Sequence, residues 1–235
     1  MCHSQQPCPC PRPCGNAPEH GDLMKHGSMV RFGRGDVLWS DGDPADWLGV
    51  VCVGTLKLTR PSEGTTDTMV DLVERGRMFG EEALVQGAQR PWTATAISSG
   101  RLIKLDGETA RHHLQQPDSR ALMDHIFGVM VERSQNLRHR FGDITDGAVG
   151  VRLARVILRL ADRVGLADSR GQFLPIRLTR LELAGFLGCR EETVIRHMSR
   201  WERAEVLLTT REGMVLQGRH LLEQEAGLLD NAAAR

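Results

Sequence analysis

The spacing of hydrophobic positions changes along this chain and divides it into parts of different structure. From residue 29 to residue 105, short apolar runs alternate with turn residues, chiefly Gly, Asp and Ser. Short runs between turn signals are typical of β-strands, and many of them at regular spacing favour a sandwich or barrel-like β-roll over a parallel sheet. The predicted strands are Val30–Phe32, Val37–Trp39, Leu48–Cys52, Leu56–Thr59, Met69–Leu72, Thr93–Ile97 and Leu102–Leu105.

After residue 117 the apolar residues follow a helical period. The positions that repeat every seven residues, with two aromatic residues between them, are Met123, Met130, Leu137 and Ile144, with Phe127 and Phe141. Such a seam is typical of a helix that pairs with another helix, although a helix packed on its own β-roll would also bury it. Because the seam is narrow and the opposite face is highly charged, we favour a dimerisation helix.

A second change follows at 147–150, where two glycines interrupt the helical pattern. An amphipathic helix is predicted over Val151–Val164, and a short strand over Phe173–Leu178. Thr179 and Glu182 then have the spacing of a capping box, which predicts a helix start. Gly188 is placed where that helix would end, since glycine tolerates a left-handed backbone.

A second helix is predicted from about residue 190, and its two faces differ. Val194, Met198 and Trp201 share one face and are expected to point inward. The outer face carries Arg190, Glu191, Glu192, Ile195, Arg196 and Arg200. A short helix–turn–helix of this kind places the second helix in the major groove, where Glu accepts from cytosine and Arg pairs with guanine. The alternative for Glu192 and Arg196, four residues apart, is an ion pair along the helix.

The segment 206–217 is predicted to form a hairpin that turns at Glu212 and Gly213, and this makes the unit a winged helix-turn-helix. Arg211 at its tip is a candidate phosphate contact, which would position the protein on DNA without specifying sequence.

Charge and composition agree with a DNA-binding module beside a module with another role. The net charge is zero, but residues 150–220 hold 13 Arg, no Lys and 8 Asp or Glu, a balance of +5. A locally basic segment is the electrostatic footprint of nucleic-acid binding. No apolar run is long enough for a transmembrane helix and no signal-peptide core is seen, so we expect a cytoplasmic protein without membrane contact.

The sequence contains no pattern that predicts an enzyme. It has no nucleophile elbow, no Gly-rich phosphate loop of the Walker type and no pair of metal ligands on a helix. Glu81 and Glu82 are adjacent in sequence and are expected to point apart, so they do not form a catalytic carboxylate pair.

The segment from Leu178 to Trp201 resembles the DNA-reading signature of the CRP/FNR superfamily of bacterial regulators, and the resemblance covers about residues 29–217. It implies an α+β fold with a β-roll like a cyclic-nucleotide-binding domain, a long dimerisation helix and a C-terminal winged helix-turn-helix. The expected boundaries are 1–22 for a Cys- and Pro-rich tail, 23–116 for the β-roll sensor, 117–146 for the dimerisation helix, 147–225 for the DNA-binding domain and 226–235 for a second tail.

The family further implies a homodimer that binds double-stranded DNA at a palindromic site and contacts RNA polymerase. By this resemblance Glu192 and Arg196 read bases. The full set of expected DNA contacts is Thr179, Arg190, Glu192, Thr193, Ile195, Arg196, Arg200 and Arg211.

The stretch from Phe79 to Leu84, with Arg90, resembles the phosphate-binding cassette of family members that bind cyclic nucleotides. Gly80, Glu81 and Arg90 would then form the ligand pocket, Glu81 on the ribose and Arg90 on the phosphate. Glu82, Pro91 and Trp92 depart from that pattern. Glu82 adds a negative charge, Pro91 has no N–H and Trp92 is bulky, so the sequence predicts that a cyclic nucleotide does not bind. The alternative is a regulator gated by a cyclic nucleotide or another small ligand in the β-roll.

Four cysteines lie within the first fourteen residues, namely Cys2, Cys8, Cys10 and Cys14. FNR-like members hold an oxygen-labile [4Fe–4S] cluster with N-terminal thiolates, and four thiolates suffice for one. The favoured hypothesis is therefore redox, oxygen or gas control at these cysteines. The spacing of these cysteines departs from the family's, so a zinc site, a thiol switch and a tail without a metal stay open as alternatives. For the protein as a whole, a protein-interaction module is the alternative to a regulator.

Overall fold

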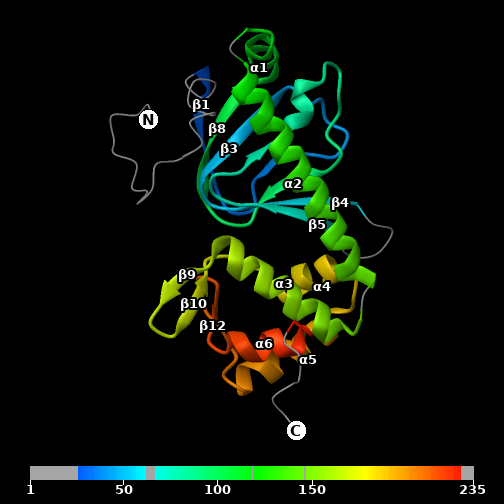
Figure 1. Cartoon of the computed structure of the whole chain (residues 1–235), viewed down its shortest axis with the longest axis vertical. Helices are drawn as coiled ribbons and strands as arrows, with labels where there is room; N and C mark the ends of the chain where they lie inside the picture. Colours follow the sequence, from blue (N-terminus) through cyan, green and yellow to red (C-terminus); the bar gives the residue numbers. More distant parts are fainter. Residues whose placement is uncertain (1–25, 62–66, 118, 146, 229–235) are drawn as a thin grey trace. The chain divides into compact units, whose positions relative to one another are not determined.

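The computed structural model describes residues 26–61, 67–117, 119–145 and 147–228, with side chains except at 121, 122, 125 and 139–145. The chain forms two compact units, one that takes in residues 26–60 and 70–136 and one that includes residues 137–228 (Figure 1). The fold class is mixed, with strands in the first unit and a helical unit with a small sheet after it, as the sequence predicts.

Two four-stranded antiparallel sheets form the first unit. One has the order β1-β8-β3-β6 and the other the order β2-β7-β4-β5. The strand bounds are β1 Ser28–Phe32, β2 Val37–Trp39, β3 Trp47–Val53, β4 Leu56–Arg60, β5 Thr68–Val73, β6 Met78–Phe79, β7 Thr93–Ala96 and β8 Gly100–Asp106. All seven predicted strands are confirmed within a few residues at their ends, and β6 is an addition, too short to show a period of its own.

The core of this unit lies between the two sheets and is rich in aromatic side chains. Trp39 and Phe79 stack with ring centroids 5.2 Å apart, and Trp47 meets both rings edge-on. Leu56, Val73 and the other buried apolar residues of both sheets complete the cluster. Strand β3 is buried on both faces, between this core on one side and the helices on the other, which explains why it is a continuous apolar run in the sequence.

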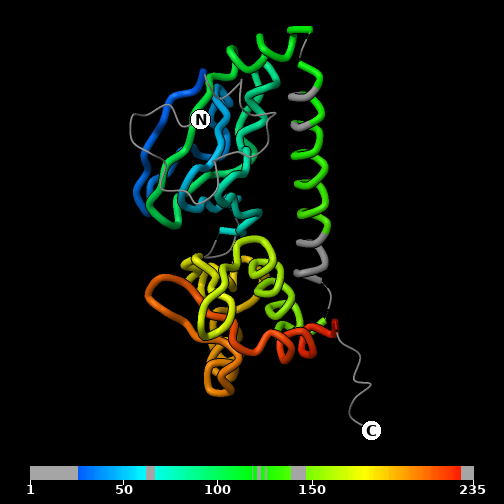
Figure 2. The backbone as a smooth tube through the Cα atoms, turned by 60° about the vertical axis from the view of Figure 1, so that its left-hand side comes forward, coloured from blue at the N-terminus to red at the C-terminus, as the bar shows by residue number. Residues whose placement is uncertain are grey.

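Three helical segments lie on the outer side of the first sheet. They are a 3-10 turn, η3, over Glu81–Leu84, helix α1 over Gly107–Leu114 and the long helix α2 over Arg120–Thr145, whose part up to residue 136 belongs to this unit. Figure 2 shows this part of α2, in green, beside the strands. Ile126 of α2 packs against Leu48, Val50, Met78 and Leu105 from the sheet. α1 and η3 were not predicted from the sequence. Asp106, whose carboxylate accepts from the Thr109 N–H, is the N-cap signal that indicates α1.

Helix α2 presents a second, exposed face. Met123, Phe127, Met130 and Leu137 of the predicted seam are between 41 and 57% exposed, whereas Ile126 and Arg133 are buried against the first unit. The seam is therefore not buried on the β-roll, because α2 packs there through another face, and the dimerisation helix stays a prediction. Phe141 and Ile144, the remaining seam residues, lie outside the side chains that the structure describes.

The second unit combines four helices with a small antiparallel sheet of order β11-β12-β10-β9. Its elements are α3 Val149–Val164, β9 Leu166–Asp168, β10 Gly171–Leu174, α4 Arg180–Leu187, α5 Glu191–Arg203, β11 Leu207–Thr209, β12 Met214–Leu216 and α6 Arg219–Glu225. The predicted strand Phe173–Leu178 is wrong at its end, because Pro175 lacks the N–H that a further ladder bond requires. The hairpin partner β9 and helix α6 were missed.

Candidate functional site

Helix α4 starts and stops where the sequence predicts. The Thr179 hydroxyl accepts from the Glu182 N–H at 3.1 Å, and the Glu182 carboxylate accepts from the Thr179 N–H at 2.9 Å. This capping box satisfies two backbone donors that the first turn leaves free. Gly188 ends the helix with φ of 60°, a left-handed backbone that glycine adopts without steric cost. The turn between α4 and α5 is therefore fixed by local chemistry.

The inner face of α5 anchors it in the second unit. Val194, Met198 and Trp201 are buried, as predicted, and the Trp201 indole N–H donates to Glu225 of α6 at 3.1 Å. Since each of these residues is one turn from the next, the burial fixes the rotation of α5 about its own axis. The opposite face of the helix is thereby held toward solvent.

The outer face of α5 is exposed, and two of its charged side chains make no hydrogen bond or ion pair with the described residues. Arg190, Glu192, Ile195 and Arg196 are all exposed, and Thr193 is half-buried. Within the described parts of the chain neither Glu192 nor Arg196 makes a side-chain hydrogen bond or ion pair. The predicted alternative, an ion pair between these two residues, is not formed. Both side chains are available to an external ligand with donors and acceptors of its own.

Arg200 differs from the other outer-face residues. Its guanidinium donates to the Glu225 carboxylate of α6, the same group that accepts from Trp201. Half-buried His197 lies beside them, with Nδ1 4.0 Å from Glu225 Oε1. Burial, with Arg200 nearby, lowers the pKa of His197, so that the imidazole is neutral at pH 7. Arg200 was predicted to contact DNA, but its guanidinium is paired with Glu225 where α5 meets α6.

The β11–β12 hairpin forms at the predicted place. The Thr210 N–H donates to the Gly213 carbonyl at 2.8 Å, and Arg211 at the tip is exposed. A Cβ atom on Gly213 would lie 2.0 Å from the Leu174 carbonyl oxygen of β10, a separation that no side chain tolerates. Glycine at this position therefore lets the hairpin join the sheet of the second unit.

Arg180 is a structural residue that sequence reasoning missed. It donates to Glu202 of α5 at 2.8 Å and to the Thr209 hydroxyl of β11 at 2.9 Å. The three side chains tie the start of α4, the end of α5 and the hairpin together. Their separation along the chain, 22 and 29 residues, offers no periodic signal from which the contact could be found.

In the first unit, Arg90 is fully buried and turned into the sandwich. It donates to the Gly80 carbonyl and to the Glu82 carboxylate, both at 3.3 Å, and also to the Trp47 carbonyl. Its guanidinium carbon lies 4.0 Å from the centre of the Trp39 ring. One carboxylate, two backbone carbonyls and an aromatic face thus already contact the guanidinium that was expected to bind a phosphate. Burial lowers the pKa of Arg90, against the effect of Glu82.

Glu81 pairs with α2 instead of facing a ribose. The Arg133 guanidinium donates to Glu81, and the two side chains are only 8 and 12% exposed. Burial raises the pKa of Glu81, and the neighbouring Arg133 opposes that effect. A second ion pair joins Arg77 to Glu132, which is the residue of α2 that precedes Arg133. These contacts join η3 and the sheet to the helix without any ligand.

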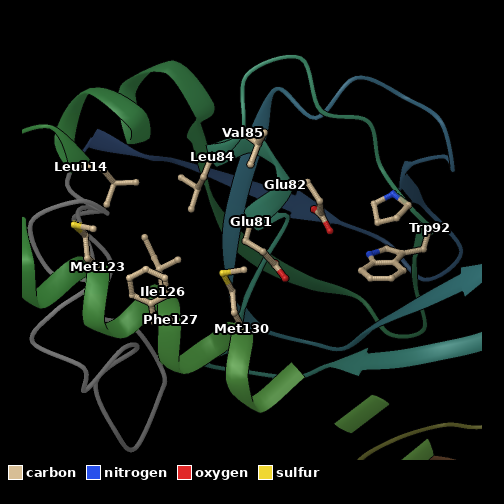
Figure 3. A pocket seen from close by; sticks show the side chains of 11 residues that line it. Glu81, Glu82, Leu84, Val85, Trp92, Leu114, Met123, Ile126, Phe127 and Met130 are labelled. Carbon is tan, nitrogen blue, oxygen red and sulfur yellow. The ribbon is translucent and has the colours of Figure 1, made fainter. Parts of the chain in front are cut away.

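A cavity of about 500 Å³ lies between η3 and helices α1 and α2 (Figure 3). Glu81 and Glu82 are the charged residues of its wall, and the remaining wall is apolar. The lining consists of Glu81, Glu82, Leu84, Val85, Pro91, Trp92, Leu114, Met123, Ile126, Phe127 and Met130. Of the predicted ligand residues Gly80, Glu81 and Arg90, only Glu81 lines this cavity.

The predicted metal ligands Cys2, Cys8, Cys10 and Cys14 lie outside the described residues. Within the described residues, no group of three or more His, Cys, Asp or Glu side chains could hold a metal ion. Cys52 is buried in β3, with its thiol toward the Val50 carbonyl, as expected for a structural cysteine. None of the described helices is long and apolar enough to cross a membrane.

Comparison with family models identifies both units. A model described as the cyclic nucleotide-binding domain matches residues 29–116, and one described as the Crp-like helix-turn-helix domain matches residues 151–225. The first covers the sandwich with η3 and α1, and the second covers α3 to α6. Together the two models account for most of the chain.

Several curated proteins are similar along most of their length. A CRP-like cAMP-activated global transcriptional regulator of Mycobacterium tuberculosis is 24% identical over 205 residues, which is 84% of this chain and 91% of that protein. The global nitrogen regulator of a Synechocystis species is 23% identical over 201 residues, 83% of this chain and 86% of that protein. Both are regulators, and neither is described as an enzyme.

Solved structures share the fold at low sequence identity. FixK2 from Bradyrhizobium japonicum superposes with a TM-score of 0.73 at 17% identity, over 88% of this chain and 99% of that one. A CRP-family transcriptional regulator from Thermus thermophilus gives 0.71 at 21% identity, over 84 and 96%. The arrangement of a β-roll, a long helix and a winged helix-turn-helix is therefore a known one.

Proposed function

Since this chain belongs to the CRP/FNR superfamily and is a DNA-binding transcription regulator, not an enzyme, we propose that it acts as a homodimer on a palindromic site. Each α5 would enter the major groove of one half-site, with Glu192 and Arg196 on base edges. The observation that carries this proposal is that both side chains are exposed, and unpaired among the residues that the structure describes, on a helix whose rotation is fixed by burial. Arg190 and Arg211 would contact phosphates.

The homodimer is supported by the exposed face of α2. Apolar side chains at the seven-residue spacing of a coiled coil rarely stay in water, because their burial against a second helix is favourable. Met123, Phe127 and Met130 are exposed by 41, 57 and 51%. A second copy that packs its own α2 on this seam would give the two-fold symmetry that a palindromic site mirrors.

The proposal is tested by measuring assembly and sequence preference together. Selection from random duplexes should return sites with two-fold symmetry, and sedimentation equilibrium should show a dimer. Phe127→Glu should raise the dimer dissociation constant at least tenfold, since it places a charge in the seam. Gln135→Glu is the matched control, because Gln135 is exposed on α2 and lies neither three nor four residues from any seam position. Equal effects of both variants, or selected sites without symmetry, would contradict the proposal.

For the signal, we propose redox or gas control at Cys2, Cys8, Cys10 and Cys14, through a [4Fe–4S] cluster. The proposal rests on the thiolates themselves. Protein purified without oxygen should be coloured and contain iron and sulfide, and brief exposure to air should bleach it. A colourless, iron-free anaerobic sample would refute the cluster and leave DNA binding untouched.

RNA polymerase as a partner and a cytoplasmic location stay predictions.

Gating by a cyclic nucleotide is the alternative that the names of the cAMP-activated relatives suggest. It would require Arg90 to leave Glu82, the Gly80 carbonyl and the Trp47 carbonyl before it could bind a phosphate. Pro91 offers no N–H, and Trp92 occupies the neighbouring position. We therefore favour a regulator that does not respond to a cyclic nucleotide.

A further inference from the structure

The cavity beside η3 is separate from the interior of the β-roll. The aromatic side chains of the sandwich core, Trp39, Trp47 and Phe79, do not line it. Its wall includes Leu84, Leu114 and Ile126, which belong to the apolar cluster between the outer side of the sheet and the helices. The space is thus built from η3, the segment around Trp92 and the helical layer, as Figure 3 shows.

The chemistry of the wall limits what can bind. A volume of about 500 Å³ is within the ordinary range of small-molecule pockets, and most of the lining is aliphatic, aromatic or thioether. The two charged residues at the wall, Glu81 and Glu82, are both acidic. Arg133 and Arg90 hold these carboxylates from behind and do not themselves line the cavity. Because both guanidinium groups are already paired with Glu82 and Glu81, an anion would find no free cation at the wall, whereas an uncharged apolar molecule needs none.

The shape of the cavity favours a small molecule over a partner helix as its occupant. Ile126 in the wall is 7% exposed and Leu84 is half-buried, so the cavity extends below the exposed rim formed by Met123, Phe127 and Met130. A second α2 lying on the seam would contact that rim. It would close the open side of the cavity and leave the deeper space between η3 and Ile126 for a ligand.

We infer that this cavity binds an uncharged, predominantly apolar small molecule that fits within its volume of about 500 Å³, and that it excludes anions. Such a ligand would touch η3 and α2 at once. It would sit beside the Glu81–Arg133 pair that already joins these elements. An effect of the ligand on DNA affinity would rest on the proposed regulator function, but binding itself does not.

The test uses the full chain and matched probes. 2-Methoxynaphthalene is uncharged, 2-naphthoate carries an anion on the same ring system, and 3′,5′-cyclic AMP is the cyclic nucleotide. Isothermal titration calorimetry should show one 2-methoxynaphthalene bound per chain, and at least tenfold weaker binding of the other two. Leu84→Trp should lower the affinity for 2-methoxynaphthalene at least tenfold by filling the cavity, and Met123→Trp provides a second filling variant at an exposed position.

Val37→Trp is the matched control, since Val37 is an exposed apolar residue of the same unit that does not line the cavity. It should bind the probe as the wild type does. Absence of probe binding, equal or tighter binding of 2-naphthoate, or unchanged affinity in both filling variants would overturn the inference. Operator binding measured on the same samples separates this outcome from a failure of the proposed function, because it does not depend on the probe.

Discussion

Arg196→Ala should remove the preference for one base pair in each half-site while leaving the rest of the recognised sequence unchanged. A bidentate contact between Arg and a base contributes about 1–3 kcal/mol of discrimination. A dimer makes the contact twice, so the selected site should be bound about 2–6 kcal/mol more weakly, and a site changed at that base pair in both halves should lose far less. Arg196 is exposed and makes no hydrogen bond or ion pair with the described residues, so its removal breaks no such contact among them.

The measurement is a titration of fluorescent duplexes that carry each single-base change, at fixed salt concentration. Arg211→Ala is the comparison variant. As a predicted phosphate contact, Arg211 should weaken binding to all duplexes alike and reduce the dependence of affinity on salt. If Arg196→Ala also weakens every duplex alike, Arg196 contacts only phosphate, and base reading must be assigned to other residues of α5.

Arg133→Met should be among the most destabilising single substitutions in the first unit. Glu81 is 12% exposed on its side chain, and it would lose the only cation that contacts it among the described residues. Breaking a buried ion pair in this way costs about 3–5 kcal/mol, because an uncompensated charge stays buried. Replacing both partners, as in Glu81→Leu with Arg133→Met, should recover most of this loss, since an apolar pair of similar volume carries no desolvation penalty.

Urea denaturation followed by tryptophan fluorescence measures this effect, because Trp39, Trp47 and Trp92 belong to the first unit. In Arg133→Met the pKa of Glu81 should rise further than burial already raises it. The folded state then holds a proton that the unfolded chain releases near pH 4.3, so the free energy of unfolding should fall as the pH rises from that value through the raised pKa. A double variant as unstable as Arg133→Met, or a loss that is independent of pH, would contradict this account.

Local patterns predict the helix-turn-helix well. The capping box at Thr179, the left-handed Gly188 and the inward positions Val194, Met198 and Trp201 all depend on residues within one or two turns of each other, and the structure places them as expected. The strands of the β-roll could be predicted for the same reason, since alternation and turn residues act over a few positions.

Contacts between distant segments could not be predicted. Arg133 is 52 residues from Glu81, and Arg90 is 43 residues from the Trp47 carbonyl that it contacts. A motif read along the chain places Glu81 and Arg90 toward a ligand, because that is their role in similar cassettes. The distant partners that turn them elsewhere, Arg133 and the Trp47 carbonyl, are supplied by the tertiary fold. For this reason the contacts of the β-roll residues expected to bind a ligand were harder to predict from the sequence than those of the helix-turn-helix.

Three positions on α2 have consequences for genetics. Met123, Phe127 and Met130 lie both in the wall of the cavity and on the exposed seam. Substitutions at any of them should be pleiotropic, with assembly and ligand response altered together, so a mutant screen that relies on them cannot separate the two traits. Leu84, which lines the cavity from η3, and Leu137, which lies on the seam alone, are the positions at which each trait should vary by itself.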